Sequence, residues 1–290
     1  MFFYEFLIAA AVIPAVVLLI YVYRKDRTEK EPIGLLLLLL VLGGLSTLAA
    51  AGLEVLASRV LDGFFADSIY YNADGEAVFS GGGKYLYYFI ENFFCVALIE
   101  EACKWLILWF VTHKSRYFAC LFDGMVYAVF VSLGFALVEN IQYVVTYGFS
   151  VAVIRAFTAV PGHMFDGVFM GYFYSFWHSY KVTNTIESRF CQTYSVPFRG
   201  NRLPEGRALA LSFVLPVVMH GVYDFTASIE EWWAGVFFVA FIVFLYVYCF
   251  RKVRELSRRD NHDINITAYW LYRKYPEYTG YLYDFLVQRW

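Results

Sequence analysis

The sequence lacks a disulfide framework and a cleavable leader. Its 290 residues include five cysteines, an odd number with no paired spacing, so we expect free thiols. The N-terminus has no basic region followed by a small-residue cleavage site, so we expect Met1–Tyr23 to remain as a first helix. The absence of a low-complexity linker argues against separate soluble domains.

Apolar residues fill the composition instead. Hydrophobic residues make up 60% of the chain and aromatic residues 21%, and the mean hydropathy is +0.54. A soluble domain of this length is far less apolar. The composition therefore predicts an all-α polytopic membrane domain over residues 1–250, with the lipid bilayer as its surroundings and no nucleic-acid partner.

Long apolar segments give the expected spans. A helix needs about 20 apolar residues to cross ~30 Å of hydrocarbon. We predict about seven transmembrane helices, at Phe2–Tyr23, Ile33–Leu56, Tyr85–Val111, Tyr117–Tyr147, Val151–Tyr180, Ala208–Ser228 and Ala234–Phe250. Pro161-Gly162 and Pro216 lie inside two of these segments and predict kinks there.

The basic residues predict the orientation. They concentrate in residues 24–32, 112–117, 181–207 and the segment after residue 250, whereas the opposite side has only Arg59 and Lys84. The positive-inside rule then places the N-terminus outside and the C-terminus in the cytosol. The tail, residues 251–290, is basic and then rich in Tyr and Trp, and we expect it to pack on the cytosolic helix ends.

Ionisable and polar residues also occur deep inside the apolar segments. A charge at the bilayer centre costs at least ~2.5–3.5 kcal/mol, so such groups face protein and are candidates for function. A rise of ~1.5 Å per residue brings them to similar depths in four different helices. The set comprises Glu100, Glu101, Lys104, Glu139, Asn140, His163, His220 and Asp224.

Spacing along each helix divides the roles. Residues four apart share a helix face, as Lys104 does with Glu100 and Asp224 with His220. Glu100 and Glu101 differ by about 100° around the axis, so only one can point at a cavity centre. Two carboxylates beside a lysine suit a group that takes a proton from water. Asp123, Asp166 and Glu54 are weaker candidates, with structural or interfacial roles equally open.

Several hydrolase signatures are missing. The sequence has no HExxH zinc motif and no GxSxG nucleophile elbow. Tyr223-Asp224 resembles half of an intramembrane aspartyl pair, but no GxGD segment follows. Glutamate together with histidine is the chemistry that remains.

Four ordered motifs resemble the PrsW family of intramembrane proteases, relatives of the CAAX-processing endopeptidases. They are EExxK at residues 100–104, FxxxE from Phe135 to Glu139, the histidine His163, and HxxxD from His220 to Asp224. The first cytosolic loop, with Asp26 and Glu31-Pro32, also resembles a family segment.

The resemblance implies a CAAX-protease-like helical core in a bacterial cytoplasmic membrane, and cleavage of a membrane-anchored protein such as an anti-sigma factor near the outer face. The implied catalytic residues are Glu100, Glu101, His163 and His220, supported by Lys104, Glu139, Asn140 and Asp224. We expect a glutamate-activated water, histidine stabilisation of the oxyanion, and no cofactor.

Three alternatives stay open. One is a zinc-dependent version of the same protease, in which Glu100, Glu139, His163 and His220 hold Zn²⁺. Another is a non-catalytic scaffold of the same fold, like the Aph subunit of gamma-secretase. The third is an ion-coupled transporter, against which the absence of an internal repeat argues.

Overall fold

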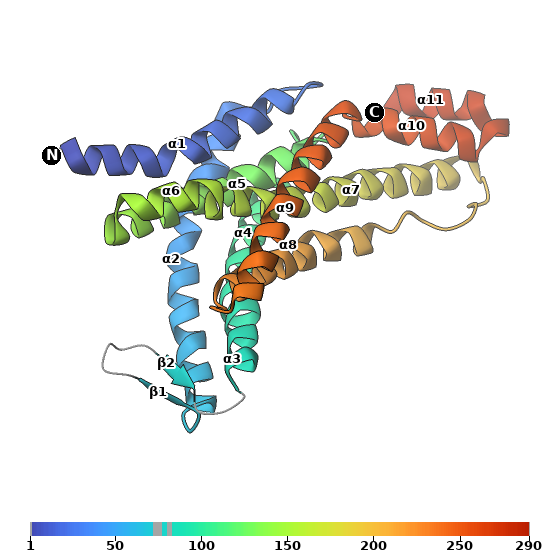
Figure 1. Ribbon diagram of the computed structural model, residues 1–290. Coiled ribbons are helices and arrows are strands. Elements are labelled where there is room, and N and C mark those ends of the chain that lie inside the picture. Colours follow the sequence, from blue (N-terminus) through green and yellow to red (C-terminus); the bar gives the residue numbers. More distant parts are fainter. Residues whose placement is uncertain (1, 72–76, 80–82, 290) are drawn as a thin grey trace.

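The computed structural model describes residues 2–71, 77–79 and 83–289, and these are mainly helical (Figure 1). The first half contains α1 (Phe2–Lys25), α2 (Ile33–Phe64), the strands β1 (Ile69–Tyr71) and β2 (Ala77–Phe79), α3 (Lys84–Ile90), the π-helix η1 (Glu91–Ala97), α4 (Leu98–Thr112) and α5 (Asp123–Tyr147). The second half contains α6 (Phe149–Phe157), α7 (Ala159–Tyr194), α8 (Glu205–Ala227), α9 (Trp232–Arg258), α10 (Asp263–Lys274), the 3₁₀ turn η2 (Pro276–Tyr278) and α11 (Thr279–Arg289).

Five of the described helices are long and apolar enough to cross a membrane: α1, α2, α5, α8 and α9. The protein is therefore a polytopic membrane protein, as its composition predicted. The other two expected spans are also helical. One is the α3–η1–α4 helix, which a π-helical segment interrupts, and the other is α7. Seven crossings, and the orientation of the termini, remain predictions.

Two of the expected segments differ from the helices that the structure contains. The fourth segment becomes helical at Asp123 and not at Tyr117, because Asp123 Oδ2 accepts the backbone N–H groups of Ala119 and Cys120 and turns the preceding chain. The fifth segment is two helices, α6 and α7, that meet at Thr158 with φ −121° and ψ −75°. Pro161 does not kink a helix there, because it lies in the first turn of α7, where no backbone N–H donor is needed.

Other helices extend beyond the expected spans. The second span was expected to end at Leu56, but α2 continues to Phe64. The predicted loop over residues 181–207 is helical as far as Tyr194, and the tail is mostly helical too. A separate apolar cluster explains why α7 and the tail are helical there, since Phe190 on α7 packs with Leu271 and Phe285 of the tail. Figure 1 shows α10 and α11 beside this end of α7.

A small hairpin departs from the all-α expectation. β1 and β2 pair antiparallel, with Ile69 opposite Phe79, beyond the end of α2 (Figure 1). The hairpin lies between Arg59 and Lys84, the two basic residues on the side that was expected outside the membrane. It leaves the helical arrangement unchanged.

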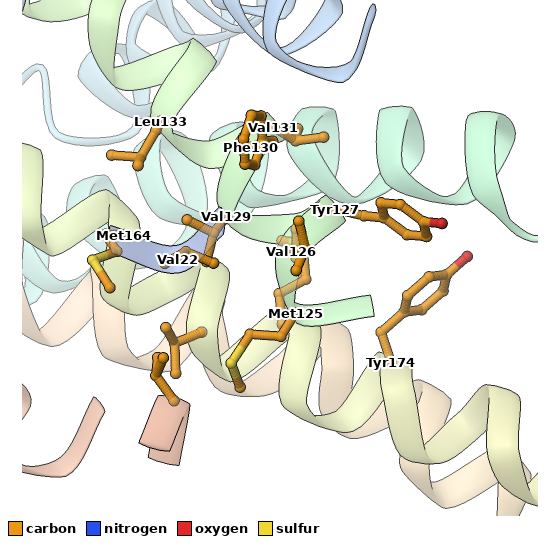
Figure 2. Packing of buried hydrophobic residues seen from close by; sticks show 14 of the residues in the cluster. Val22, Met125, Val126, Tyr127, Val129, Phe130, Val131, Leu133, Met164 and Tyr174 are labelled. Atoms are coloured by element: carbon orange, nitrogen blue, oxygen red, sulfur yellow. The ribbon is translucent and has the colours of Figure 1, made fainter. Parts of the chain in front are cut away.

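Helix α5 is the central element. It packs mainly against α2 and α7. Every residue of its first half, from Asp123 to Ala136, is buried. Its buried side chains, among them Val126 and Val129, pack with Met164 of α7 in one apolar cluster (Figure 2). Glycine permits the closest approach: a Cβ on Gly134 of α5 would lie 2.1 Å from the Leu40 carbonyl oxygen of α2. Small residues at such contacts are typical of membrane helix pairs.

Candidate active site

A π-helical segment directly precedes the EExxK motif. Residues Glu91–Ala97 form η1, and α4 begins at Leu98. π-Helical turns are rare and frequent at functional sites. Here the segment packs on α8, where a Cβ on Gly221 would lie 2.5 Å from a ring carbon of Phe93. This close contact brings Glu100 and Glu101 alongside His220, the neighbour of Gly221.

Lys104 joins three of the predicted groups. Its ammonium donates to Glu100 Oε2 at 2.9 Å and to Glu101 Oε1 at 2.7 Å. It also lies 3.1 Å from His163 Nδ1. An ammonium has no lone pair to accept with, so Nδ1 accepts and the proton of a neutral His163 ring is on Nε2. Lys104 is fully buried, so its charge depends on compensation from buried partners, and Glu100 and Glu101 are the two carboxylates in direct contact with it.

His163 links this group to Glu139 on α5. Its Nε2 lies 2.8 Å from Glu139 Oε2. Arg155 of α6 donates to the same oxygen at 2.7 Å and, through Nε, to Asn140 Oδ1 at 2.9 Å. Asn140 in turn donates to the carbonyl of Ala11 on α1 at 2.8 Å. Glu139 is therefore held in place from α6 and α7.

His220 lies between two carboxylates. Its Nδ1 is 2.8 Å from Glu101 Oε1, and its Nε2 is 3.0 Å from Asp224 Oδ2. Asp166 Oδ2 is 3.7 Å from Nδ1, and Glu100 Oε2 is 3.9 Å from Nε2. Carboxylate oxygens accept, so both ring nitrogens act as donors when these acids are ionised. The arrangement favours a positively charged His220.

These groups surround a cavity of about 430 Å³. Glu100, Glu139, His163, Asp166, His220 and Asp224 line it, together with Glu54 of α2 and Asn92 of η1. Glu101 does not line it and has no exposed surface, and its second oxygen has no hydrogen-bond partner. The two neighbouring glutamates thus differ in exposure, as their positions around the helix predicted.

The predicted site residues come together, with one displaced. All eight belong to one hydrogen-bonded network, which Asn140 joins through Arg155, and the i,i+4 pairs are in direct contact. Asn140 points away from the cavity toward α1. The sequence prediction omitted Arg155 and undervalued Asp166. An arginine in the apolar segment 149–157, and an aspartate three residues after His163 on the same helix face, were the available signals.

Four residues of the site are of the types that bind metal ions. Glu100, Glu101, His163 and His220 offer ligand atoms within 4.8 Å of one another, and two imidazoles with carboxylates are a zinc-type set. These donors are engaged, however. The Lys104 ammonium occupies the space between Glu100, Glu101 and His163. Both nitrogens of His220 face carboxylates. The residues as arranged do not fit a bound zinc ion.

Comparison with known proteins agrees with the motifs. Residues 31–249 match the family described as PrsW family intramembrane metalloprotease. The chain is 32% identical over 219 residues to Protease PrsW of Oceanobacillus iheyensis, covering 76% of this chain and 81% of that protein. It is 30% identical over 249 residues to Protease PrsW of Bacillus subtilis, covering 86% and 94%. No solved structure matches the chain. The chain belongs to the PrsW family and is a membrane-embedded peptidase.

Proposed function

We propose that the protein is an intramembrane endopeptidase of the bacterial cytoplasmic membrane that hydrolyses a membrane-anchored protein with a water activated by Glu100. The supporting observation is the difference between the two neighbouring glutamates. Glu100 lines the polar cavity, whereas Glu101 is buried behind it against Lys104 and His220. A general base has to reach solvent and substrate, and Glu100 alone of the pair does so.

The reaction follows from this arrangement. The carboxylate of Glu100 takes a proton from water, and the resulting hydroxide attacks the scissile carbonyl carbon. The negative charge that develops on the carbonyl oxygen is met by the Nε2–H of His220, which turns to the oxyanion from its contact with Asp224, another residue that lines the cavity. Such a donor contributes about 2.7–4 kcal/mol in soluble proteases. The C–N bond then breaks, and Glu100 passes its proton to the leaving amine. Water is consumed, and a carboxylate and an amine end are released.

The remaining groups set charge and position. Lys104 contacts Glu100 directly at 2.9 Å and fixes the position of its carboxylate. Glu101 and Asp224 hold the His220 ring from its two sides. His163 contacts Lys104 and Glu139, so its expected assistance to the base is indirect. Fixed hydrogen-bond partners of this kind preserve the geometry during the reaction.

The substrate approaches from the outer face. Two cavity-lining residues, Tyr143 and Ser228, come from helix ends that the positive-inside rule assigns to the outside. An adjoining pocket of about 480 Å³ shares Tyr143, Arg155 and Tyr223 with the cavity and is mainly apolar beyond them. We assign to it an apolar side chain of the substrate next to the scissile bond. A single-pass anchor of the anti-sigma-factor type fits both features.

A zinc-dependent mechanism is the alternative. The family description names a metalloprotease, and four potential ligands lie close together. It requires Lys104 to leave its present partners and His220 to give up a carboxylate contact. No step of the proposed mechanism depends on a metal.

The test is cleavage in proteoliposomes. Purified protein is reconstituted with epitope-tagged single-pass membrane proteins of the host, and fragments are followed by immunoblot and mass spectrometry. The proposal predicts cleavage within or beside the membrane anchor by wild type, with and without chelator, and none by Glu100→Gln. Chelator inactivation that Zn²⁺ reverses, with an unchanged unfolding midpoint, establishes the zinc mechanism. Cleavage of no host anchor by wild type supports a scaffold.

A further inference from the structure

A second group of metal-binding residue types lies away from the cavity, on the side that is predicted to be cytosolic. Glu29, Cys120 and His262 each offer a ligand atom, and these atoms lie within 4.8 Å of one another. Cys120 Sγ is 3.2 Å from His262 Nδ1, and the same nitrogen is 3.9 Å from Glu29 Oε2. The three residues come from three separate segments, after α1, before α5 and before α10.

The spacing fits a tetrahedral zinc ion. Zinc binds sulfur at ~2.3 Å and nitrogen or oxygen at ~2.0–2.2 Å, so two ligand atoms of one ion lie ~3.3–3.6 Å apart. The Cys120–His262 distance is already close to this range, and Glu29 needs only a small side-chain movement. Its side chain is 66% exposed and free to make one.

The backbone already fixes two of the three ligands. Cys120 and His262 form an isolated antiparallel bridge, in which Leu121 N–H donates to Asn261 O at 3.1 Å and Asp263 N–H to Ala119 O at 2.8 Å. A ligand pair held in place before the metal arrives loses little conformational freedom on binding.

Asp260 supports the same arrangement from behind. Its two carboxylate oxygens accept the backbone N–H groups of Thr28 and Phe122, at 3.2 Å and 3.0 Å. These residues are the near neighbours of Glu29 and Cys120. Partners that orient ligands in this way are a regular part of metal sites.

The surroundings also favour a cation. Four carboxylates act electrostatically on the Cys120 sulfur, those of Glu29, Asp123, Asp260 and Asp263. Cys120 is 1% exposed, so a thiolate there needs a positive partner in direct contact. Sulfur and imidazole ligands select a borderline-soft divalent ion over Mg²⁺ or Ca²⁺.

We propose that Glu29, Cys120 and His262 form a cytosolic zinc site that clamps the tail and the first loop to the start of α5. The role is structural and separate from the catalytic cavity. Glu29 and His262 both lie outside residues 31–249, the part that the family description matches.

The test uses Co²⁺ as an optical probe of the full-length protein in detergent, after removal of metals by chelator. Co²⁺ bound to a thiolate gives a charge-transfer band in the near ultraviolet. The proposal predicts this band in wild type, its disappearance in Cys120→Ser, and a loss of Co²⁺ affinity of ~10-fold or more in His262→Ala. Zn²⁺ should displace Co²⁺ and raise the unfolding temperature of wild type but not of Cys120→Ser.

Two matched controls separate this site from others. Cys191→Ser removes a thiol elsewhere on the same side, and Cys103→Ser removes the thiol next to Lys104 at the catalytic cluster. Both should keep the band. The proposal is overturned if wild type gives no band, or if the band survives in Cys120→Ser. In either case Cys120 and His262 share only a hydrogen bond.

Discussion

Glu101 Oε1 lies 2.8 Å from Nδ1 of His220, although the two residues are 119 positions apart in the chain. The same oxygen accepts from Lys104 at 2.7 Å. One carboxylate with no exposed surface thus joins α4 to α8 and holds two positively charged donors. Glu100, its neighbour in sequence, is left to face the cavity.

Lys104→Met should destabilise the protein strongly. The substitution leaves Glu100 and Glu101 without their shared cation, and stranding a buried charge costs about 3–5 kcal/mol. The thermal unfolding midpoint in detergent reports the loss. The double variant Lys104→Met/Glu101→Gln should recover part of it, since one unpaired carboxylate is removed. If the double variant is as unstable as the sum of both singles, the ion pair is not the cause.

Gly134→Ala should destabilise the contact between α2 and α5. The added Cβ would lie 2.1 Å from the Leu40 carbonyl oxygen, and overpacking typically costs about 1–3 kcal/mol. Gly52→Ala on α2 is the matched control, because nothing lies within 4 Å of its added Cβ. Its unfolding midpoint should equal or exceed that of wild type. Equal midpoints for both variants would contradict the close packing.

The stability of the first loop, residues 26–32, which is predicted to be cytosolic, should fall as the pH rises. Burial raises the pKa of Glu31 from its ordinary 4.5 to about 7, and that of Asp26 to about 6. The folded state then binds more protons than the unfolded state, so the stability that these two groups contribute is lost as the pH rises from 3.8, the ordinary pKa of Asp26, to about 7. The measurement is the unfolding midpoint of wild type across this range.

Glu31→Gln should flatten this profile. The glutamine keeps an acceptor for the Tyr127 hydroxyl, which donates to Glu31 at 2.6 Å, but it cannot ionise. A smaller dependence of the unfolding midpoint on pH should remain, because the pKa of Asp26 is also raised. The exposed Glu230→Gln is the control and should retain the wild-type profile. A Glu31→Gln profile as steep as wild type would assign the pH dependence to another group.

Gly235→Leu should reduce cleavage without loss of stability. Gly235 lines the apolar pocket next to the cavity, and nothing lies within 4 Å of its added Cβ. The leucine therefore occupies space assigned to a substrate side chain, at a cost of about 1–3 kcal/mol in kcat/KM, or roughly 10–200-fold. Gly52→Leu, outside both pockets, should cleave normally. Normal cleavage by Gly235→Leu would remove the pocket from the substrate path.

The membrane class and most of the site followed from the sequence for physical reasons. An apolar segment long enough to cross the bilayer is expected to form a helix. A charged side chain inside such a segment has to face protein and not lipid. Four-residue spacing then gave the contacts of Lys104 with Glu100 and of His220 with Asp224. These are local relations along one helix.

Contacts between helices were harder to predict. The ion pair of Arg155 with Glu139 depends on the break at Thr158, which turns α6 back toward α5. The break itself had no clear signal, because Pro161 three residues later suggested a kink inside one helix. The side chain of Asn140 points away from the cavity because its amide donates to the Ala11 carbonyl of α1. Such tertiary partners are not encoded in the spacing of one segment.

The central claim is that Glu100 is the base and Glu101 its support, and the most direct measurement compares their glutamine variants. Each is assayed for single-turnover cleavage in proteoliposomes and for its unfolding midpoint. The account predicts that Glu100→Gln keeps a midpoint near that of wild type and loses about 10²–10⁴-fold or more in rate. Glu101→Gln should instead show the larger fall in midpoint, because Lys104 and His220 lose a shared partner. Substantial cleavage by a folded Glu100→Gln protein would contradict the account.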